Sequence, residues 1–310
     1  MSEFVTGVEE MAGAAGAVGT TAFPTRPSRS YWRESADRLW GNRVAVLCAV
    51  YIVLLAIAAL AAPLISRYVT HSDATSQDLT RLFQAPGGGH LLGTDELGRD
   101  TLTRLVYGAQ VSLTVGFLTA ALSLVVGGTV GMVAGYLGGW LDTLLMRLVD
   151  VILSIPAIFL FILLSTLLRP NAVTLSFIIA FVGWGNVGRL VRAEALSLRS
   201  REFIVATRSI GAGTVRLIAR HLVPNALPVM IVAASLAVGQ IILAESALSF
   251  LGLGIQPPTP SWGNMLSYAQ QYYYHSAWLV VFPGVMIFLV VLAASLLGNA
   301  VRDAFDPRLR

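Results

Sequence analysis

The sequence predicts an all-α membrane protein with six transmembrane helices. Of its 310 residues, 55% are hydrophobic and only 12% are charged, about half the charged share of a soluble domain. The mean hydropathy is +0.72. The charged residues are separated by long apolar runs, and a membrane-spanning helix needs about 20 mostly apolar residues. Composition therefore places the chain in the membrane class.

The N-terminal region is predicted to stay outside the bilayer. Residues 1–30 are rich in Gly, Ala, Thr and Pro and lack the basic and apolar regions of a cleaved signal peptide, so we expect a disordered cytoplasmic tail. Residues 31–43 place Trp32 and Trp40 among charges, which predicts a short interfacial helix on the inner leaflet. An aromatic belt before the first span is the alternative.

The six spans follow from the apolar runs between charged residues. From residue 220 to 302 the only charge is Glu245, and the Gly- and Pro-containing stretch 251–260 divides that run into two spans. The spans form one domain at 44–300, and a cytoplasmic tail follows at 301–310. We expect them near residues 44–66, 111–136, 144–167, 171–188, 227–250 and 277–299.

Arginines orient the predicted bundle. All 21 basic residues are arginine, and most lie before span one, in the loop 189–226 and in the C-terminal tail. Six spans put these three segments on one side, which the positive-inside rule makes the cytoplasm. The outer side receives the loop 67–104, a short turn near Arg169 and the uncharged loop 251–276.

The loop 189–226 carries a predicted helix–turn–helix. Residues 193–210 have apolar side chains at helical spacing, and Gly211 and Gly213 are expected to end that helix. Thr214 is placed to cap a second helix, and Pro224 marks the return into span five. Because this element is amphipathic and too polar to insert into the bilayer, we expect it to rest on another protein.

The stretch "EFIVATRSIGAGTVRLIARHLVPNALP" (202–228) resembles the EAA loop of ABC-importer permeases. It keeps Ala206, Gly211 and Pro224 of that pattern. Three more stretches resemble the C-type permease subunit of the dipeptide, oligopeptide and nickel importers: "HLLGTDELGRDTLTRLVYGAQVSL" (90–113), "ESALSFLGLGIQPPTPSWGNML" (245–266) and "VRDAFDPRLR" (301–310). The EAA loop departs from the pattern at Val205, Thr207, His221 and Val223.

The resemblance implies a type I ABC importer permease fold and a set of partners. Permeases of this family work in pairs, dock two cytoplasmic ATPases and receive cargo from an extracytoplasmic binding protein. Their EAA loop forms a coupling helix that sits in a cleft of the ATPase, and ATPase closure switches the bundle from inward-open to outward-open. Carried over, the coupling element lies at about 202–216, and its expected residues with the following proline are Glu202, Ala206, Thr207, Ile210, Gly211, Ala212, Gly213, Arg216 and Pro224.

The chain itself is not expected to be an enzyme. A Walker A loop needs a lysine against the phosphates, and this chain has none. The segment "GAGTVR" (211–216) lies between helices rather than after a strand. ATP and Mg²⁺ are therefore expected on the partner ATPases, and no catalytic, cofactor-binding or metal-binding residue is expected here. The single cysteine and four scattered histidines form no metal motif, and the arginines between spans do not indicate nucleic acid.

Three further features invite interpretation. The stretch "LGTDELGRD" (92–100) contains four charged residues close together, Asp95, Glu96, Arg99 and Asp100. One interpretation is that they dock the binding protein or help to seal the outer gate. The other is that they form a loop locked by Asp–Arg pairs. The EF-hand ligand pattern is absent there, which disfavours calcium. Gly127, Gly131 and Gly135 recur at four-residue spacing in span two, which predicts close helix packing.

Two carboxylates fall within predicted spans and are candidates for the transport pathway. Asp150 lies one turn from Arg147 in span three and either pairs with it or has a further role. Glu245 lies in span five, where it either faces the path and meets a peptide ammonium group, or bonds to the partner permease or to the backbone near Gly239.

Together these features predict the transmembrane permease subunit of an ATP-driven, binding-protein-dependent importer of dipeptides or oligopeptides in the bacterial cytoplasmic membrane, with both termini cytoplasmic. One alternative is an ABC importer permease for nickel, glutathione or another small solute, although the predicted spans lack histidine. Alternatives of other classes are an ATP-independent secondary transporter or channel, and a membrane scaffold without transport activity. The sequence does not identify the peptide.

Overall fold

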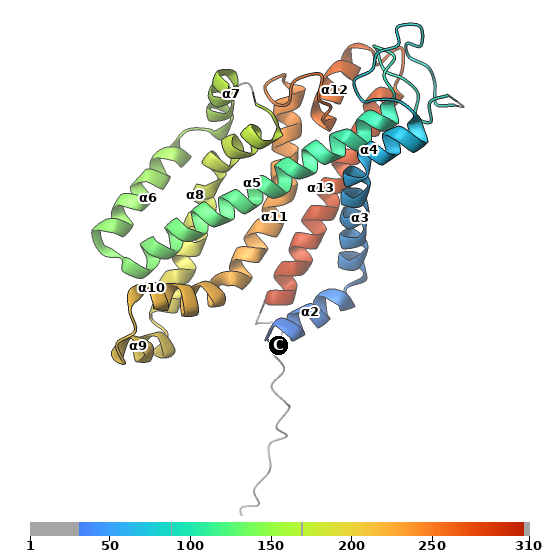
Figure 1. Cartoon of the computed structure of the whole chain (residues 1–310). Coiled ribbons are helices and arrows are strands. Elements are labelled where there is room, and N and C mark those ends of the chain that lie inside the picture. The colour runs from blue at the N-terminus through green and yellow to red at the C-terminus, as the bar shows by residue number, and fades with distance from the viewer. Residues whose placement is uncertain (1–30, 88, 169, 307–310) are drawn as a thin grey trace, which may run out of the picture.

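The fold is a bundle of long helices with short helices at both ends (Figure 1). The computed structural model describes residues 31–87, 89–168 and 170–306, and these residues form no β-strand. The predicted tail at 1–30 lies outside the described residues. The helices, in chain order, are α2 (Tyr31–Gly41), α3 (Arg43–Leu60), α4 (Ala62–Ile65), α5 (Thr101–Leu137), α6 (Gly139–Ser154), α7 (Ala157–Leu168), α8 (Ala172–Arg199), α9 (Glu202–Ser209), α10 (Thr214–Leu217), α11 (Val223–Phe250), α12 (Trp262–Gln271) and α13 (Trp278–Phe305).

Within the described residues, five helices are long and apolar enough to cross a bilayer. They are α3, α5, α8, α13, and α10 with α11 as one continuous helix. The pair α6–α7 passes the same test only when taken together, and it is bent by 84°. The structure therefore agrees with six predicted spans when the bent pair counts as one.

The third span is not the straight helix that we predicted over 144–167. α6 ends at Ser154 and α7 begins at Ala157, with Pro156 between them. Proline lacks the backbone N–H that would continue the helix, and it disfavours helical backbone at the residue before it. Ile155 accordingly has extended backbone angles.

Several boundaries differ from those predicted. α5 begins at Thr101 rather than near 111, and α8 continues to Arg199 rather than ending at 188. α13 reaches Phe305, so residues 301–305 of the predicted tail are helical. The segment 251–276 contains α12, which we did not predict. Apolar runs in the sequence indicate only the part of a helix that faces lipid. They do not show the polar turns by which a helix extends beyond the bilayer.

The helices α5 and α8 lie in close contact along the predicted glycine stripe. A Cβ at Gly127, Gly131 or Gly135 would collide with backbone carbonyl oxygens of α8, at Trp184, Gly188 and Arg192 respectively. Small residues let two helix backbones approach closely, and such packing is a main source of helix association in membranes. The prediction of tight packing at this stripe is confirmed.

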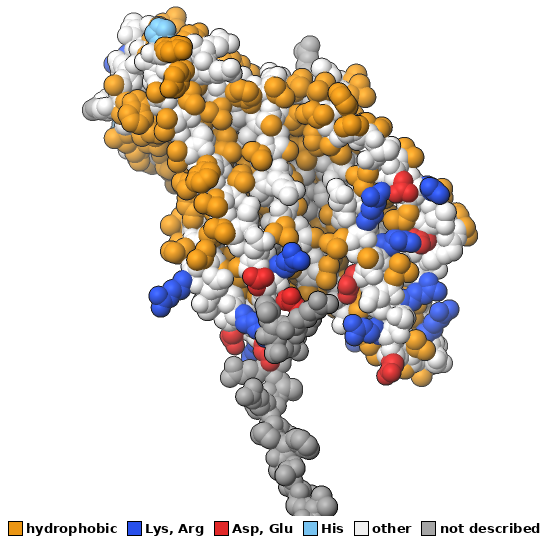
Figure 2. Space-filling model, turned by 180° about the vertical axis from the view of Figure 1, so that it is seen from behind, with side chains coloured by type: hydrophobic (Ala, Val, Ile, Leu, Met, Phe, Trp, Pro, Cys, Tyr) orange, Lys and Arg blue, Asp and Glu red, His pale blue; other side chains and the backbone are white. Residues whose placement is uncertain are grey.

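The two ends of the bundle differ in content. The segment 71–100 and α12 lie at one end, and α2, α9, α10 and the end of α13 lie at the other (Figure 1). Figure 2 shows that charged side chains gather toward the second end, while the rest of the visible surface carries many hydrophobic side chains and few charges. The described parts of the arginine-rich segments that we placed on one side therefore share one end of the molecule.

Candidate functional site

The coupling candidate is an elbow made of α9, the turn 210–213 and α10. The turn closes α9 by a Schellman motif, in which Gly211 N–H donates to the Arg208 carbonyl (3.0 Å) and Ala212 N–H donates to the Thr207 carbonyl (3.3 Å). Gly211 has φ +89°, a left-handed conformation that glycine adopts without steric cost. Gly211 therefore ends the first helix, as predicted.

The elbow is anchored by few side chains and is otherwise exposed. Ile204 is buried against a cluster that contains Met132 and Tyr136 of α5 and Leu217 of α10. In contrast, the side chain of Ile210 at the turn is 85% exposed. The exposed coupling candidates are Glu202, Ala206, Ile210, Gly211, Gly213, Arg216 and Pro224, and the half-buried ones are Thr207 and Ala212.

Parts of the predicted helix–turn–helix were wrong. The first helix does not run unbroken over 193–210, because α8 ends at Arg199 and α9 starts anew at Glu202. Thr214 does not cap the second helix, since Gly213 occupies the capping position and no side chain caps it. α10 continues through one turn of π-helix (Ile218–Leu222) into α11. The elbow is therefore continuous with a helix that is long and apolar enough to cross a bilayer.

The structure places Pro224 apart from the turn of the elbow. It lies in the first turn of α11 and lines a cleft that also involves Trp32 of α2 and Arg302 of α13. The remaining coupling candidates follow one another along α9, the turn and α10.

Two ion pairs connect the bent span to α8. The guanidinium of Arg192 donates two hydrogen bonds to the Asp142 carboxylate, at 2.5 and 2.7 Å. Arg189 donates to Asp150 at 2.6 Å. Of the two alternatives for Asp150, the pair with Arg147 is not the one that forms, because its carboxylate pairs with Arg189 of α8. Asp150 and its partner are about half exposed.

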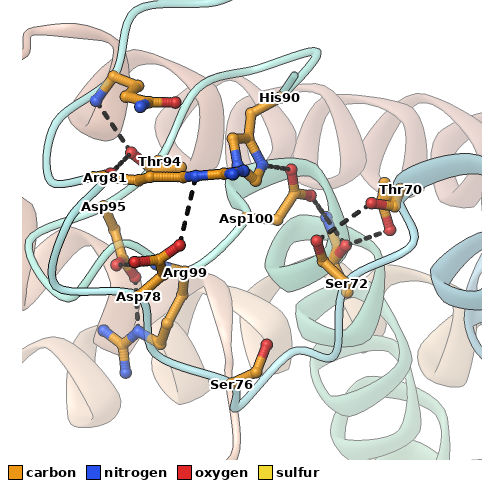
Figure 3. Close-up of polar contacts among 12 residues, drawn as sticks. Thr70, Ser72, Ser76, Asp78, Arg81, His90, Thr94, Asp95, Arg99 and Asp100 are labelled. Carbon is orange, nitrogen blue, oxygen red and sulfur yellow. Dashed lines mark hydrogen bonds and ion pairs between the residues drawn. The ribbon is translucent and has the colours of Figure 1, made fainter.

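The loop 71–100 is held by buried charged side chains of the loop and of the first turn of α5 (Figure 3). Asp95 accepts a hydrogen bond from the Arg99 side chain at 2.7 Å and lies 3.3 Å from Arg104. The same carboxylate accepts the backbone N–H groups of Leu97 and Arg99, both at 2.9 Å. Glu96 accepts a further bond from Arg99 at 2.5 Å.

Asp100 fixes the start of α5. Its side chain accepts the backbone N–H of Thr103 at 2.8 Å, which caps the helix. Its other oxygen lies 2.9 Å from Nδ1 of His90, and Figure 3 shows the two side chains facing each other. Since Asp95, Arg99 and Asp100 are all buried, the geometry matches the locked-loop interpretation, and these three side chains do not present their charges to a docking partner.

Glu245 is fully buried, at 0% exposure. Its carboxylate accepts hydrogen bonds from Ser112 of α5 and Ser249 of α11, both at 2.8 Å. Ser249 in turn accepts the backbone N–H of Ile255 at 3.1 Å. In this conformation Glu245 therefore joins α5, α11 and the outer segment after α11, and it faces neither an open path nor a surface that a partner could reach.

The sequence interpretation missed the serines around Glu245 and the amide side chains of Asn186 and Gln240. A signal for the serines was present in the sequence, because both lie inside apolar runs and Ser249 stands four residues after Glu245. Ser112 lies in the run of the second span. Among the residues with described placement, no group of three or more His, Cys, Asp or Glu side chains is arranged to hold a metal ion.

Residues 127–310 match the family described as "binding-protein-dependent transport system inner membrane component". Residues 30–86 match the "N-terminal TM domain of oligopeptide transport permease C". The chain is 41% identical over 281 residues to the dipeptide transport system permease protein DppC of Alkalihalophilus pseudofirmus, covering 91% of each chain.

Other relatives and one structure agree. The chain is 36% identical to DppC of Haemophilus influenzae, covering 94% of this chain and 98% of that one. It is 34% identical to the oligopeptide transport system permease protein OppC of Bacillus subtilis, covering 96% of each. A structure of the MetNI methionine ABC transporter in an inward-facing conformation matches in fold, with a TM-score of 0.53 and 21% identity over 66% of this chain and 97% of that chain.

Proposed function

The chain belongs to the family of binding-protein-dependent transport system inner membrane components, and we propose that it is the permease subunit of an ATP-driven importer of dipeptides or oligopeptides. It has the type I ABC importer permease fold that its sequence predicted. Identity to dipeptide and oligopeptide permeases over nearly the whole chain favours peptides over nickel, glutathione or another small solute.

The exposed elbow is the observation that carries the coupling role. Ile210 and Val215 are 85% and 80% exposed at the charged end of the molecule. Apolar side chains grouped on an exposed surface commonly mark an interaction site. The elbow continues without a break, through one turn of π-helix, into α11. A partner that grips α9 and the turn can therefore tilt a membrane-spanning helix.

The partners follow from this arrangement. Two ATPase subunits or domains would bind ATP and Mg²⁺, since a chain without lysine cannot form a Walker A loop. A second permease would complete the pathway, and an extracytoplasmic binding protein would deliver the peptide. The arginine-rich end that carries α2 and α9 would face the cytoplasm of a bacterial cell.

The test is reconstitution of the purified complex in vesicles. We expect the chain to copurify with a second permease and two ATPase polypeptides, and to support ATP-dependent uptake of a labelled dipeptide only when the binding protein is present. Ala206→Glu on the exposed face of α9 should abolish stimulation of ATP hydrolysis by the loaded binding protein, while the complex still forms. Uptake that needs no ATPase would instead indicate a secondary transporter or channel.

A matched control lies on another charged surface. Arg33 is also exposed at the same end but belongs to α2, so Arg33→Glu should leave ATPase stimulation intact. Full coupling in Ala206→Glu would remove the elbow from the mechanism, and absence of any transport would support the scaffold alternative.

A further inference from the structure

Two adjoining clefts form a groove along α8 and α11. The cleft nearer the middle of the bundle has a volume of about 430 Å³ and lies between α5, α8 and α11. The cleft nearer the charged end has a volume of about 820 Å³ and lies between α2, α8, α11 and α13. Leu190, Ala233 and Leu236 line both clefts. The groove therefore extends from the charged end to the middle of the membrane-spanning helices.

The middle cleft has a mostly apolar lining into which two amide and two hydroxyl side chains are set. Asn186 lies near the centre of α8 and Gln240 within α11, and both are exposed on the groove. Ser123 of α5 also lines it. The Ser123 hydroxyl is buried, with the residue 4% exposed, and it has no hydrogen-bond partner among the described residues.

These side chains are unsuited to contact with lipid tails. The hydrocarbon core offers no hydrogen-bond partner, so an exposed amide or an unpaired hydroxyl at that depth is costly. Polar groups within membrane spans accordingly face the bundle interior or a water-filled cavity. The opposite face of α8 shows the contrast, because Phe177 and Phe181 project there into an apolar hollow beside α5 and α7.

Resting on the function proposed above, we propose that this groove is one wall of the peptide pathway and that Asn186, Gln240 and Ser123 contact the peptide backbone. Each amide offers two donors and one acceptor oxygen, and the hydroxyl can donate or accept. These groups complement the C=O and N–H of a peptide bond, which every peptide carries whatever its side chains. The facing wall would come from the second permease.

The charge distribution adds a property to this pathway. The lining of the middle cleft contains no charged side chain. Charged side chains line only the cleft nearer the charged end, and they include Glu194, Arg201 and Arg302. A neutral wall at membrane depth does not favour cargo of either sign, so the pathway accepts acidic, basic and neutral peptides alike, and discrimination by charge is left to the binding protein.

The first test measures water access and needs no transport. Cys48 is the only cysteine, so Cys48→Ala gives a background free of thiols in this chain. Asn186→Cys and Gln240→Cys would be compared with Phe181→Cys, on the opposite face of α8. The reagents are a cationic and an anionic methanethiosulfonate, applied to the complex in vesicles of phosphatidylcholine and phosphatidylglycerol.

We expect both groove thiols to react about tenfold faster or more than the thiol at 181, because ionised reagents are excluded from hydrocarbon. Prior addition of the dipeptide and binding protein should slow labelling at 186 and 240. Groove thiols that react as slowly as the thiol at 181 would overturn the proposal and show a face packed against lipid or against the second permease.

The second test gives the wall a charge. Asn186→Asp changes the side chain little in size, and Asn299→Asp makes the same change in α13 at a position that lines neither cleft. The readout is the ratio of Ala-Lys uptake to Ala-Glu uptake with one binding protein throughout, so that its own preference cancels. We expect Asn186→Asp to raise this ratio by roughly fivefold at low ionic strength, and Asn299→Asp to leave it unchanged.

A ratio unaffected by Asn186→Asp would overturn the assignment of this residue to the pathway. Failure of the proposed function would look different, because the unmodified complex would then show no ATP-dependent peptide uptake at all. The labelling pattern is independent of that result, so the two proposals can fail separately.

Discussion

The loop 71–100 and the elbow at 202–216 both carry several charged side chains and lie at opposite ends of the bundle (Figure 1), but the charges are paired within the loop and exposed on the elbow. In the outer loop the Arg99 side chain is 6% exposed and bonded to two carboxylates. In the elbow Arg208 and Arg216 are exposed. The first region is closed upon itself, and the second offers its surface outward.

The difference can be traced to the supply of acidic residues. In "LGTDELGRD" three acids surround one arginine at spacings of one to four residues, so each charge finds a partner within the loop. In 202–216 Glu202 is the only acid beside two arginines. An excess of one sign cannot be neutralised locally, and it leaves a surface suited to a partner of complementary charge.

We expect the largest effect from a substitution that removes a buried charge from the loop 71–100. Asp95→Asn removes a buried charge from Arg99 and Arg104 and weakens the acceptor of two backbone N–H groups. Removing one member of a buried ion pair typically costs about 3–5 kcal/mol. We expect thermal unfolding in detergent to occur at clearly lower temperature, and protease to cut within 71–100.

The control for this change is Asp78→Asn in the same loop. The Asp78 carboxylate pairs with Arg81 at 3.3 Å, but both side chains are about half exposed. Exposed pairs contribute little, so this variant should melt close to the unmodified protein. Equal melting of Asp95→Asn and Asp78→Asn would contradict the view that the buried charges hold the loop.

A second comparison lies within the elbow. Ile204 is 2% exposed and Ile210 is 85% exposed, although the two side chains are chemically identical. Ile204→Ala should lower the free energy of unfolding by about 2–5 kcal/mol, because it leaves a cavity among buried neighbours. Ile210→Ala should change it by less than about 0.5 kcal/mol.

For coupling to the ATPase, in contrast to stability, we expect the Ile210 side chain to be important. Because its side chain is free to enter an ATPase cleft, Ile210→Ala should reduce ATP-dependent uptake by about tenfold, equivalent to about 1.4 kcal/mol of lost contact, in a complex of normal thermal stability. The measurement is uptake per assembled complex alongside a melting curve. Normal uptake by Ile210→Ala would mean that the exposed turn is not part of the interface.

The sequence predicted this contrast only in part. Apolar runs and arginine positions identified the spans and the shared end of the arginine-rich segments, because both are set by the solvent around the chain. The glycine stripe on α5 and the Gly211 turn were also predictable, since each depends on local backbone geometry. The elbow's exposure was inferred from its polarity and its resemblance to a coupling loop.

The missing parts depend on contacts between distant segments. The partner of Asp150 is Arg189 of α8 rather than Arg147 one turn away, and sequence spacing could not show which helix lies alongside. Glu245 is surrounded by serines of α5 and α11, which only the packed bundle brings together. The bend at Pro156 was signalled by the proline, but the apolar run around it outweighed that signal.

The smallest effect concerns Glu96, at the edge of the closed region, where the protonation state of one carboxyl can be varied by pH. Burial, followed by the nearby Asp95 charge, raises the pKa of Glu96, and these outweigh the lowering effects of its backbone hydrogen bond, of Arg99 and of Arg104. A raised folded-state pKa favours the protonated form, so the contribution of Glu96 to stability is full below its unfolded pKa of about 4.3. That contribution is lost as pH rises through the folded value.

Glu96→Gln keeps a neutral side chain at every pH, so its melting temperature relative to the unmodified protein should rise between pH 4 and pH 8. A relative melting temperature that falls over this range would mean that the bond to Arg99 dominates and that Glu96 belongs to the ionised core of the loop.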